Sequence, residues 1–215
     1  MQSMANPAPT PAAPAPGPFE LSGGRLCLDF VNSWGDRARP ETDQLRSFGD
    51  LLAFSGQTGL LDEAQRRKLQ GQAAGAKGAQ AAFDSAVRLR ESLYRIFAGR
   101  ARGREAQGRD LEILNAVLKE ALAHLRVEAR PQAGTGGFAW SFDETCIPTS
   151  PLWPIARSAA ELLTSADFER VTQCDGSDCT WLFLDRSRTG NRRWCSMSSC
   201  GNRAKARRHY HRRKE

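Results

Sequence analysis

Two short cysteine pairs, Cys174-Asp-Gly-Ser-Asp-Cys179 and Cys195-Ser-Met-Ser-Ser-Cys200, organise the C-terminal part of this 215-residue chain. Four of its six cysteines fall here, with four residues inside each pair and fifteen residues between the pairs. Each pair can present two thiolates from one turn, and the segment between them is long enough for a hairpin that brings the turns together. Four soft ligands from two turns suit a tetrahedral ion, so the pattern predicts one Zn²⁺ with four Cys ligands.

Two alternatives to a metal site remain open, a pair of disulfides and four unrelated buried thiols. The common spacing inside such a pair is two residues, but the Gly, Ser and Asp residues found here tolerate tight turns. Disulfides suit secreted proteins, and Met1–Pro18, almost wholly small, polar or proline, lacks the basic start and apolar centre of a signal peptide. We expect residues 1–18 to be a disordered Ala/Pro-rich tail. No segment is apolar enough to span a membrane, so we expect a cytoplasmic, reducing setting.

The net charge of +7 is concentrated at one end of the chain. Residues 186–215 contain eleven Arg or Lys and one acid, a balance of +10, whereas the first 185 residues balance to −3. A mildly acidic body with a strongly basic end predicts a polyanionic partner for that end.

Hydrophobic periodicity predicts a mainly helical body. Leu26, Leu28 and Phe30 alternate with polar or small residues, as in a strand, with Cys27 as a small buried residue. The Gly-rich segment after Arg130 suggests a hairpin. We also expect helices from 42 or 43 to 55, from 62 to 71 or 75, from 79 to 100, from 110 to 125 and from 151 to 165, and strands at 127–130 and 137–142.

Three side-chain placements follow from these helices. The arginines of the long helix, Arg88, Arg90 and Arg95, fall on its polar faces, opposite an apolar stripe. His124 lies beside the leucine stripe of the next helix, with no acid or thiol nearby in sequence, which favours a structural or surface histidine. The body contains no phosphate loop, paired metal-binding histidines or nucleophile elbow, so we expect no enzyme.

The cysteine pairs are followed by a basic helix that starts at Ser198 or Cys200 and is anchored by the metal. Like charges four residues apart destabilise such a helix in isolation, and phosphates would relieve the repulsion. Asn202 and Arg203 are candidates for base edges, because asparagine can pair with adenine and arginine with guanine. The other candidate nucleic-acid contacts are Arg186, Arg188, Arg192, Arg193, Lys205, Arg207, Arg208, Arg212 and Arg213.

Three segments of the C-terminal part, Trp181–Asp185, Arg192–Met197 and Cys200-Gly-Asn-Arg203, resemble the bacterial CGNR zinc-finger family. In the body, Gly24–Asn32 and Pro151–Leu163 are similar to the opening strand and last helix of the ABATE domain, which precedes the finger in that family. The resemblance covers roughly residues 19–213. It implies a stress-induced transcription regulator with zinc on Cys174, Cys179, Cys195 and Cys200, and a DNA-facing helix that starts near Asn202.

We therefore expect an α+β, mainly α protein with an ABATE-like domain at 19–169 and a finger of one β-hairpin and a basic helix at 170–215. The expected function is zinc-dependent, DNA-binding regulation of transcription, with the body acting as a sensor or oligomerisation domain. One finger reads few base pairs, so a homodimer or a partner protein would supply specificity. The alternatives are an RNA target, or a body that binds a small ligand while the finger contacts another protein.

Overall fold

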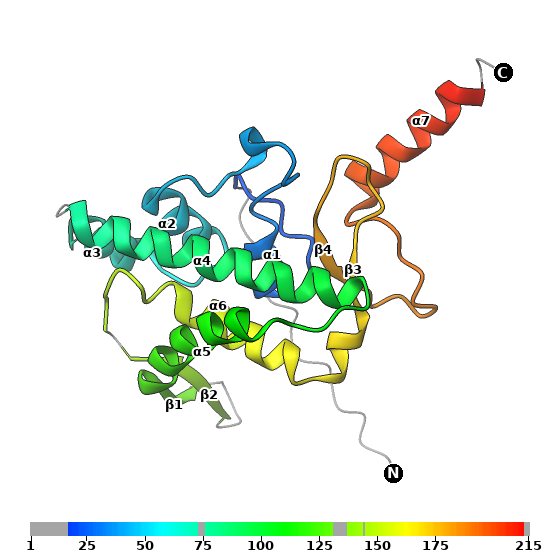
Figure 1. Ribbon diagram of the computed structural model, residues 1–215. Coiled ribbons are helices and arrows are strands. Elements are labelled where there is room, and N and C mark those ends of the chain that lie inside the picture. Colours follow the sequence, from blue (N-terminus) through cyan, green and yellow to red (C-terminus); the bar gives the residue numbers. More distant parts are fainter. Residues whose placement is uncertain (1–16, 73–75, 131–136, 144, 213–215) are drawn as a thin grey trace, which may run out of the picture.

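The computed structural model describes residues 17–72, 76–130, 137–143 and 145–212 (Figure 1). They form a mainly helical body, two small antiparallel sheets and a projecting C-terminal helix, which confirms the expected α+β, mainly α class. The tail expected at residues 1–18 lies outside the described residues, apart from Gly17 and Pro18. None of the described helices is long and apolar enough to cross a membrane.

The body comes first along the chain and the cysteine-bearing part follows. The elements of the body are α1 (Leu26–Val31), η1 (Pro40–Thr42), α2 (Phe48–Gln57), α3 (Glu63–Gln72), α4 (Ala76–Ala101), α5 (Gly108–Ala123), β1 (Leu125–Arg130), β2 (Gly137–Phe142), α6 (Leu152–Leu163) and η2 (Ala166–Arg170). The elements of the C-terminal part are β3 (Val171–Gln173), β4 (Leu182–Leu184), the single-turn π-helix η3 (Met197–Gly201) and α7 (Asn202–Arg212).

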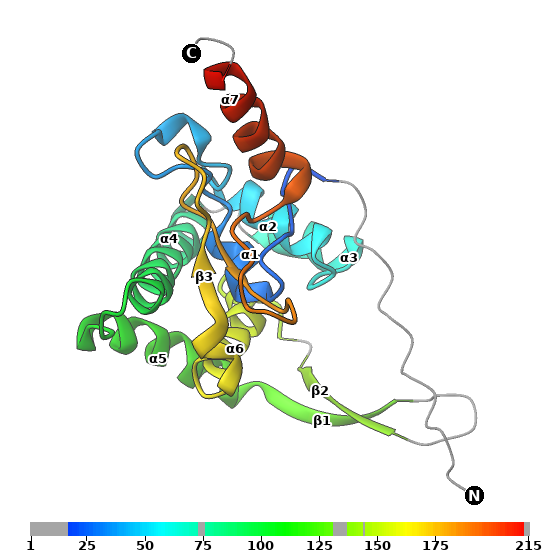
Figure 2. The same ribbon diagram turned by 90° about the vertical axis from the view of Figure 1, so that its right-hand side faces the viewer.

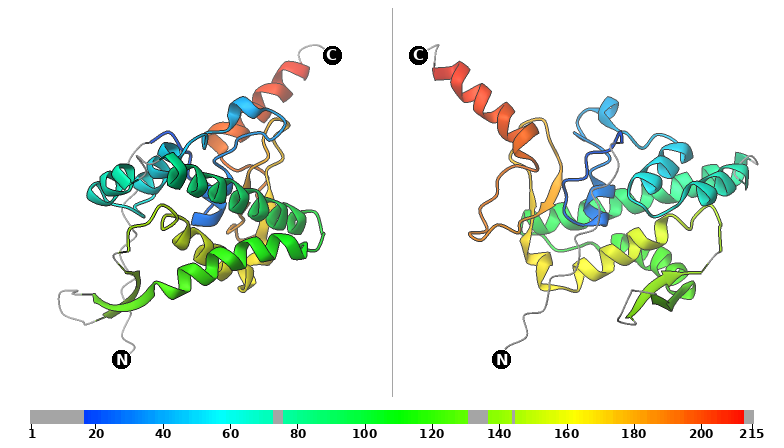
Figure 3. Two further views of the ribbon diagram at one scale, coloured as in Figure 1. Left: turned by 60° about the vertical axis from the view of Figure 1, so that its left-hand side comes forward. Right: turned by 180° about the vertical axis from the view of Figure 1, so that it is seen from behind.

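Helix α4 lies at the centre of the body. Its apolar stripe is fully buried, as its sequence pattern predicted, and packs against α1, α2, α5 and α6. The strand β3 packs against the same helix, so α4 joins the body to the C-terminal part (Figure 3). The buried stripe residues are Ala86, Leu89, Leu93, Ile96 and Phe97.

The strand expected at residues 26–30 is wrong, because this segment is the short helix α1. Cys27 and Val31 are as deeply buried as Leu28 and Phe30, so burial does not follow the alternation of a strand. Helix α1 packs against both α4 and α6, so it has apolar residues on more than one face. Its sequence therefore lacks the helical period of a helix with one buried face. The expectation that Cys27 is a small buried residue is confirmed.

Helix α2 starts later than Thr42 or Asp43, because Ser47 is its N-cap and accepts a hydrogen bond from the Asp50 backbone. Asp43 instead binds Arg90, at 2.6 and 2.7 Å, through both carboxylate oxygens. Arg90 was expected on a polar face of α4, and its side chain is only 1% exposed. Its partner comes from 47 residues earlier in the chain, so the helix pattern alone could not indicate its burial.

Two placements around α5 also differ from the expectation. Leu114 is buried, but Leu111 and Leu122 of the same leucine stripe are exposed, so the stripe only partly faces the core. His124 has an acid partner, since its Nδ1 lies 2.9 Å from Oδ2 of Asp143. The His124 ring also stacks on Trp153 with 4.2 Å between centroids, which makes it a structural residue.

The sheet β3–β4 belongs to the hydrophobic core of the body. Val171, Leu182 and Leu184 lie in the same buried cluster as α1, α4 and α6. The side chain of Asn32, directly after α1, donates to the carbonyl of Leu182 and accepts from its N–H, both at 2.8 Å. Asn32 therefore pairs with β4 as a neighbouring strand would, and it holds the cysteine-bearing part on the body.

Candidate metal centre and nucleic-acid interface

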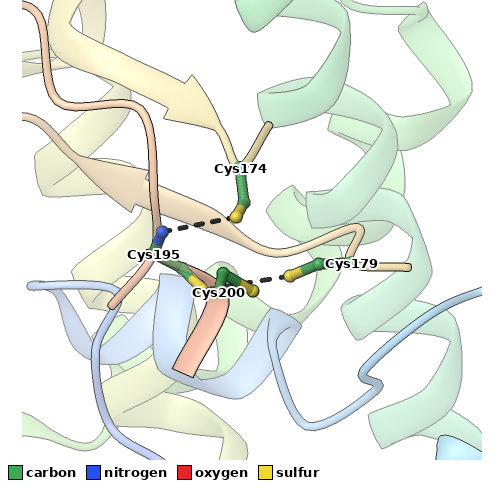
Figure 4. Close-up of side chains that lie close together, drawn as sticks. All are labelled: Cys174, Cys179, Cys195 and Cys200. Atoms are coloured by element: carbon green, nitrogen blue, oxygen red, sulfur yellow. Dashed lines mark hydrogen bonds between the residues drawn. The ribbon is translucent and has the colours of Figure 1, made fainter. Parts of the chain in front are cut away.

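The four cysteines predicted to bind a metal come together at one point, between the ends of β3 and β4 and the start of α7 (Figure 4). Their sulfur atoms all lie within 4.8 Å of one another. Cys195 is 3.8 Å from Cys179 and 3.5 Å from Cys200, sulfur to sulfur. A tetrahedral ion with Zn–S bonds of about 2.3 Å has sulfur–sulfur edges of about 3.8 Å, whereas a disulfide is about 2.05 Å long. The spacing fits one Zn²⁺ ion with four Cys ligands, and all four cysteines are free of disulfides.

The first turn, which carries Cys174 and Cys179, is positioned by the body. The Cys174 N–H donates to the Trp181 carbonyl at 2.9 Å and so extends the β3–β4 ladder by one step. Beyond Cys179, the Thr180 N–H donates to the carbonyl of Gly35, and the indole of Trp181 donates to that of Trp34, both at 3.1 Å. The body loop after Asn32 therefore supports the first two sulfur ligands.

The second turn, which carries Cys195 and Cys200, is held against the first. The Asp175 N–H donates to the Arg193 carbonyl at 2.9 Å, and the Arg193 guanidinium pairs with the Asp175 carboxylate at 2.7 Å. Cys200 lies in the π-helix η3, and the Gly201 N–H closes that turn on the Ser196 carbonyl. Local backbone bonds thus bring the second pair of sulfurs to the first.

Hydrogen bonds at the cluster show why it needs a cation. Bonds from the Cys179 and Cys195 thiols, together with the backbone N–H groups of Cys195 and Gly176, lower the pKa of the Cys174 thiol. The bonds toward Cys174 raise the pKa of the Cys179 and Cys195 thiols, because a second thiolate beside the first is disfavoured. A positive ion at the centre would favour the thiolate form of all four cysteines.

Gly176 allows the first turn to approach the sulfur atoms closely. A Cβ atom on this residue would lie 3.0 Å from the Cys179 Cβ and 3.2 Å from the Cys200 sulfur. Glycine at this position lets the backbone N–H reach the Cys174 sulfur at 3.4 Å, which is the close backbone approach expected around a metal tetrathiolate.

The basic residues predicted to contact nucleic acid divide into two groups. Arg192 is used inside the fold, where it covers the Phe183 ring and donates to the carbonyls of Trp194 and Cys195. Arg193, Arg203 and Arg207 contact Asp175, Cys200 and Asp178, respectively. Arg213 lies outside the described residues. Arg193, Arg203 and Arg207 are exposed despite these contacts, as are Arg186, Arg188, Asn202, Lys205, Arg208 and Arg212.

Helix α7 extends from the metal centre away from the body (Figure 2). Ala204, in its first turn, is buried. Arg203 and Arg207 are four residues apart, so they share the side of the helix that contacts the cysteine turns. Lys205, Arg208 and Arg212 follow at steps of three and four and therefore form the opposite side, which is exposed. The helix presents a cationic face to solvent while its other face contacts the cysteine turns.

Family models match both parts of the chain. Residues 24–166 match the ABATE family, whose description is "Putative stress-induced transcription regulator", and residues 170–213 match the CGNR zinc finger. Among curated proteins, no sequence matches this chain. Both matched models describe regulatory or zinc-finger families rather than enzyme families.

Proposed function

Since the chain belongs to the ABATE family and ends in a CGNR zinc finger, we propose that it is a zinc-dependent, DNA-binding regulator of transcription. One Zn²⁺ held by Cys174, Cys179, Cys195 and Cys200 would fix the start of α7. The observation that carries the proposal is the exposed cationic face of α7, which projects beyond the metal centre (Figure 1). The role is binding rather than catalysis.

The dimensions and charge of α7 support duplex DNA as the partner. Its eleven residues correspond to about 16 Å of helix, which the major groove can accommodate. Lys205, Arg208 and Arg212 would contact phosphates, joined by Arg186 and Arg188 from the loop after β4. Asn202, exposed at the first position of α7, is the candidate for a base edge.

Salt dependence of binding tests this proposal. With zinc-loaded protein and labelled duplex DNA, fluorescence anisotropy should give a Kd that rises steeply with salt. Arg208→Ala should weaken binding to all sequences and reduce the slope of log K against log[salt] by about 1. The matched control is Arg109→Ala, an exposed arginine at the start of α5 in the body, which should change neither quantity. Binding that is insensitive to salt, or equal losses for both variants, would contradict the proposal.

Structured RNA is the alternative partner for the same cationic face. Competition between duplex DNA and structured RNA of equal length, at near-physiological salt, separates the two. If RNA displaces the bound DNA more effectively than duplex DNA does, the function is RNA binding. Sequencing of sheared genomic DNA retained by the protein would then show whether any duplex sequence is preferred.

The body has a regulatory role in this proposal, because it shares a cleft with the finger. A cleft of about 490 Å³ lies between the body loop around Asp36 and Arg39 and the finger residues Asp178 and Arg203. A molecule bound there would touch both parts at once. A small ligand that raises the melting temperature of the zinc-loaded protein and changes its Kd for DNA would support a sensor role.

One finger of this size reads only a few base pairs, so we propose that two copies bind together on DNA. Light scattering of the complex with a duplex of about 30 base pairs should give two protein chains per duplex. A single chain at saturation would assign the body to regulation rather than to oligomerisation.

A further inference from the structure

Arg203 is exposed, yet it contacts the metal centre directly. Its Nη2 donates to the sulfur of Cys200 at 2.9 Å, across the junction between η3 and α7. The residue lies in the first turn of α7, three positions after the ligand that it contacts.

A second arginine, one helical turn later, contacts the other cysteine turn. Nη1 of Arg207 donates to Oδ1 of Asp178 at 3.3 Å, and Asp178 immediately precedes Cys179. The two arginines are four residues apart and therefore lie on the same face of α7. One side of α7 is therefore in contact with the second turn through Arg203 and with the first turn through Arg207.

The chemistry of a zinc tetrathiolate makes the Arg203 contact consequential. Four thiolates around Zn²⁺ carry a net charge of −2, and a neighbouring cation partly neutralises this negative charge. Backbone N–H groups of Gly176 and Cys195 already donate to the Cys174 sulfur at 3.4 Å. The Arg203 side chain gives Cys200 a charged donor at shorter distance, and groups that hydrogen-bond a metal ligand typically change metal affinity by about 10–100-fold.

We propose that Arg203 is a positioning residue of the metal centre, which holds the Cys200 thiolate on the ion and fixes the start of α7. The contact engages one nitrogen of its guanidinium, and we assign Arg203 this role in place of the base-reading role that its position in the sequence suggested. The inference rests on the zinc centre alone and holds whichever nucleic acid the finger binds. Base contacts then fall to the exposed residues on the other side of the helix.

Zinc affinity and a spectroscopic signature test this role in the full chain. Competition with a chromophoric chelator should show that Arg203→Ala lowers the apparent zinc affinity by about 10–100-fold. In the Co²⁺-substituted protein the same variant should shift the thiolate-to-metal charge-transfer bands, because one thiolate loses its donor. Lys205→Ala removes a cation two positions away on the opposite face, and both readouts should stay at wild-type values.

The variant Arg203→Lys keeps the charge but loses the planar group that reaches the sulfur, so it should fall between wild type and Arg203→Ala. If Arg203→Ala does not fold, Arg203→Lys is the variant on which both readouts are measured. Wild-type zinc affinity and Co²⁺ spectra in the folded Arg203 variants would overturn the proposal. If the Arg203 variants lose DNA binding while both metal readouts stay unchanged, Arg203 is a base reader. If the variants weaken the metal site but neither they nor the wild type bind DNA, this inference stands and the proposed function fails.

Discussion

The chain contains two antiparallel hairpins of opposite character. β1–β2 pairs six residues on each strand, yet Val127, Phe138 and Trp140 on one of its faces are each more than half exposed. β3–β4 pairs only three residues on each strand, and all of Leu182–Leu184 is buried. The longer hairpin projects from the body, and the shorter one lies within its core (Figure 2).

The two hairpins differ in what surrounds them, and the longer one is the less covered. A two-stranded sheet alone is marginal in water, so each hairpin depends on what covers it. β3–β4 has the apolar core against its side chains, Asn32 against the backbone of β4, and the metal centre at its open end. We therefore expect substitutions around β3–β4 to destabilise the whole body and those on the exposed face of β1–β2 to have little effect.

The largest expected effect comes from Asn32→Ala. It leaves the buried N–H and C=O groups of Leu182 without partners, at about 1–3 kcal/mol for each group. Chemical denaturation should show the loss in the free energy of unfolding, and hydrogen exchange should show faster exchange at the Leu182 amide. The control is Asn191→Ala, an exposed asparagine in the loop after β4. Equal small losses for the two variants would mean that Asn32 does not support β4.

The next effect is that of Leu182→Ala, which removes a fully buried side chain from the shared core. Large-to-small substitutions of this kind cost about 2–5 kcal/mol. The thermal midpoint of the entire body should fall in one transition, because β4 and the helices share one hydrophobic cluster. Leu182→Met conserves volume and should cost less than about 1.5 kcal/mol. A separate low-temperature transition for the C-terminal part would show that β4 unfolds independently.

The pH dependence of the stability provides a third test, with a smaller expected effect, of the region around β4. Burial raises the pKa of Asp29 to about 6, although its carboxylate accepts the Gly23 N–H at 2.7 Å. The Gly23 carbonyl in turn accepts from the Leu184 N–H, so this turn borders β4. The folded state binds a proton more tightly than the unfolded chain, and stability should therefore fall by about 2–3 kcal/mol as the pH rises from about 4 to 6. Asp29→Asn should remove this part of the pH dependence, and an unchanged profile would contradict it.

The smallest effect is expected on the exposed hairpin. Phe138→Ser replaces a ring that is 80% exposed, and surface changes of this kind usually shift stability by less than about 0.5 kcal/mol. The same denaturation experiment as for Leu182→Ala measures it. A loss of several kcal/mol would show that another surface covers this face in solution, and the contrast between the two hairpins would disappear.

The sequence predicted those features whose cause is local. Four cysteines in two short turns indicate the metal centre, because their spacing in the sequence already groups the sulfurs in pairs. The stripe of α4 was also predicted correctly, since this helix has one apolar face toward the core. The hairpin β1–β2 followed from two short expected strands around a Gly-rich stretch.

Most of what the sequence did not predict depends on partners far away in the chain. The burial of Arg90 requires Asp43, and the support of the first cysteine turn requires Asn32, Trp34 and Gly35 from the body. No periodicity or spacing in the sequence indicates these distant contacts. The contact of Arg203 with Cys200 is local, but the basic composition of the helix favoured a base reader over a partner of the metal ligand.

Because Asn32 binds β4, the finger should not function when it is transferred to another protein without this part of the body. The region that matches the finger model starts at residue 170, so a cassette cut there separates Leu182 from Asn32 and the Trp181 indole from Trp34. A chimera that joins such a cassette to an unrelated body would carry the four sulfurs but lack the segment that positions two of them. Recombination that preserves this finger must therefore transfer residues 32–35 with it, although they are encoded nearly 140 codons upstream of Cys174.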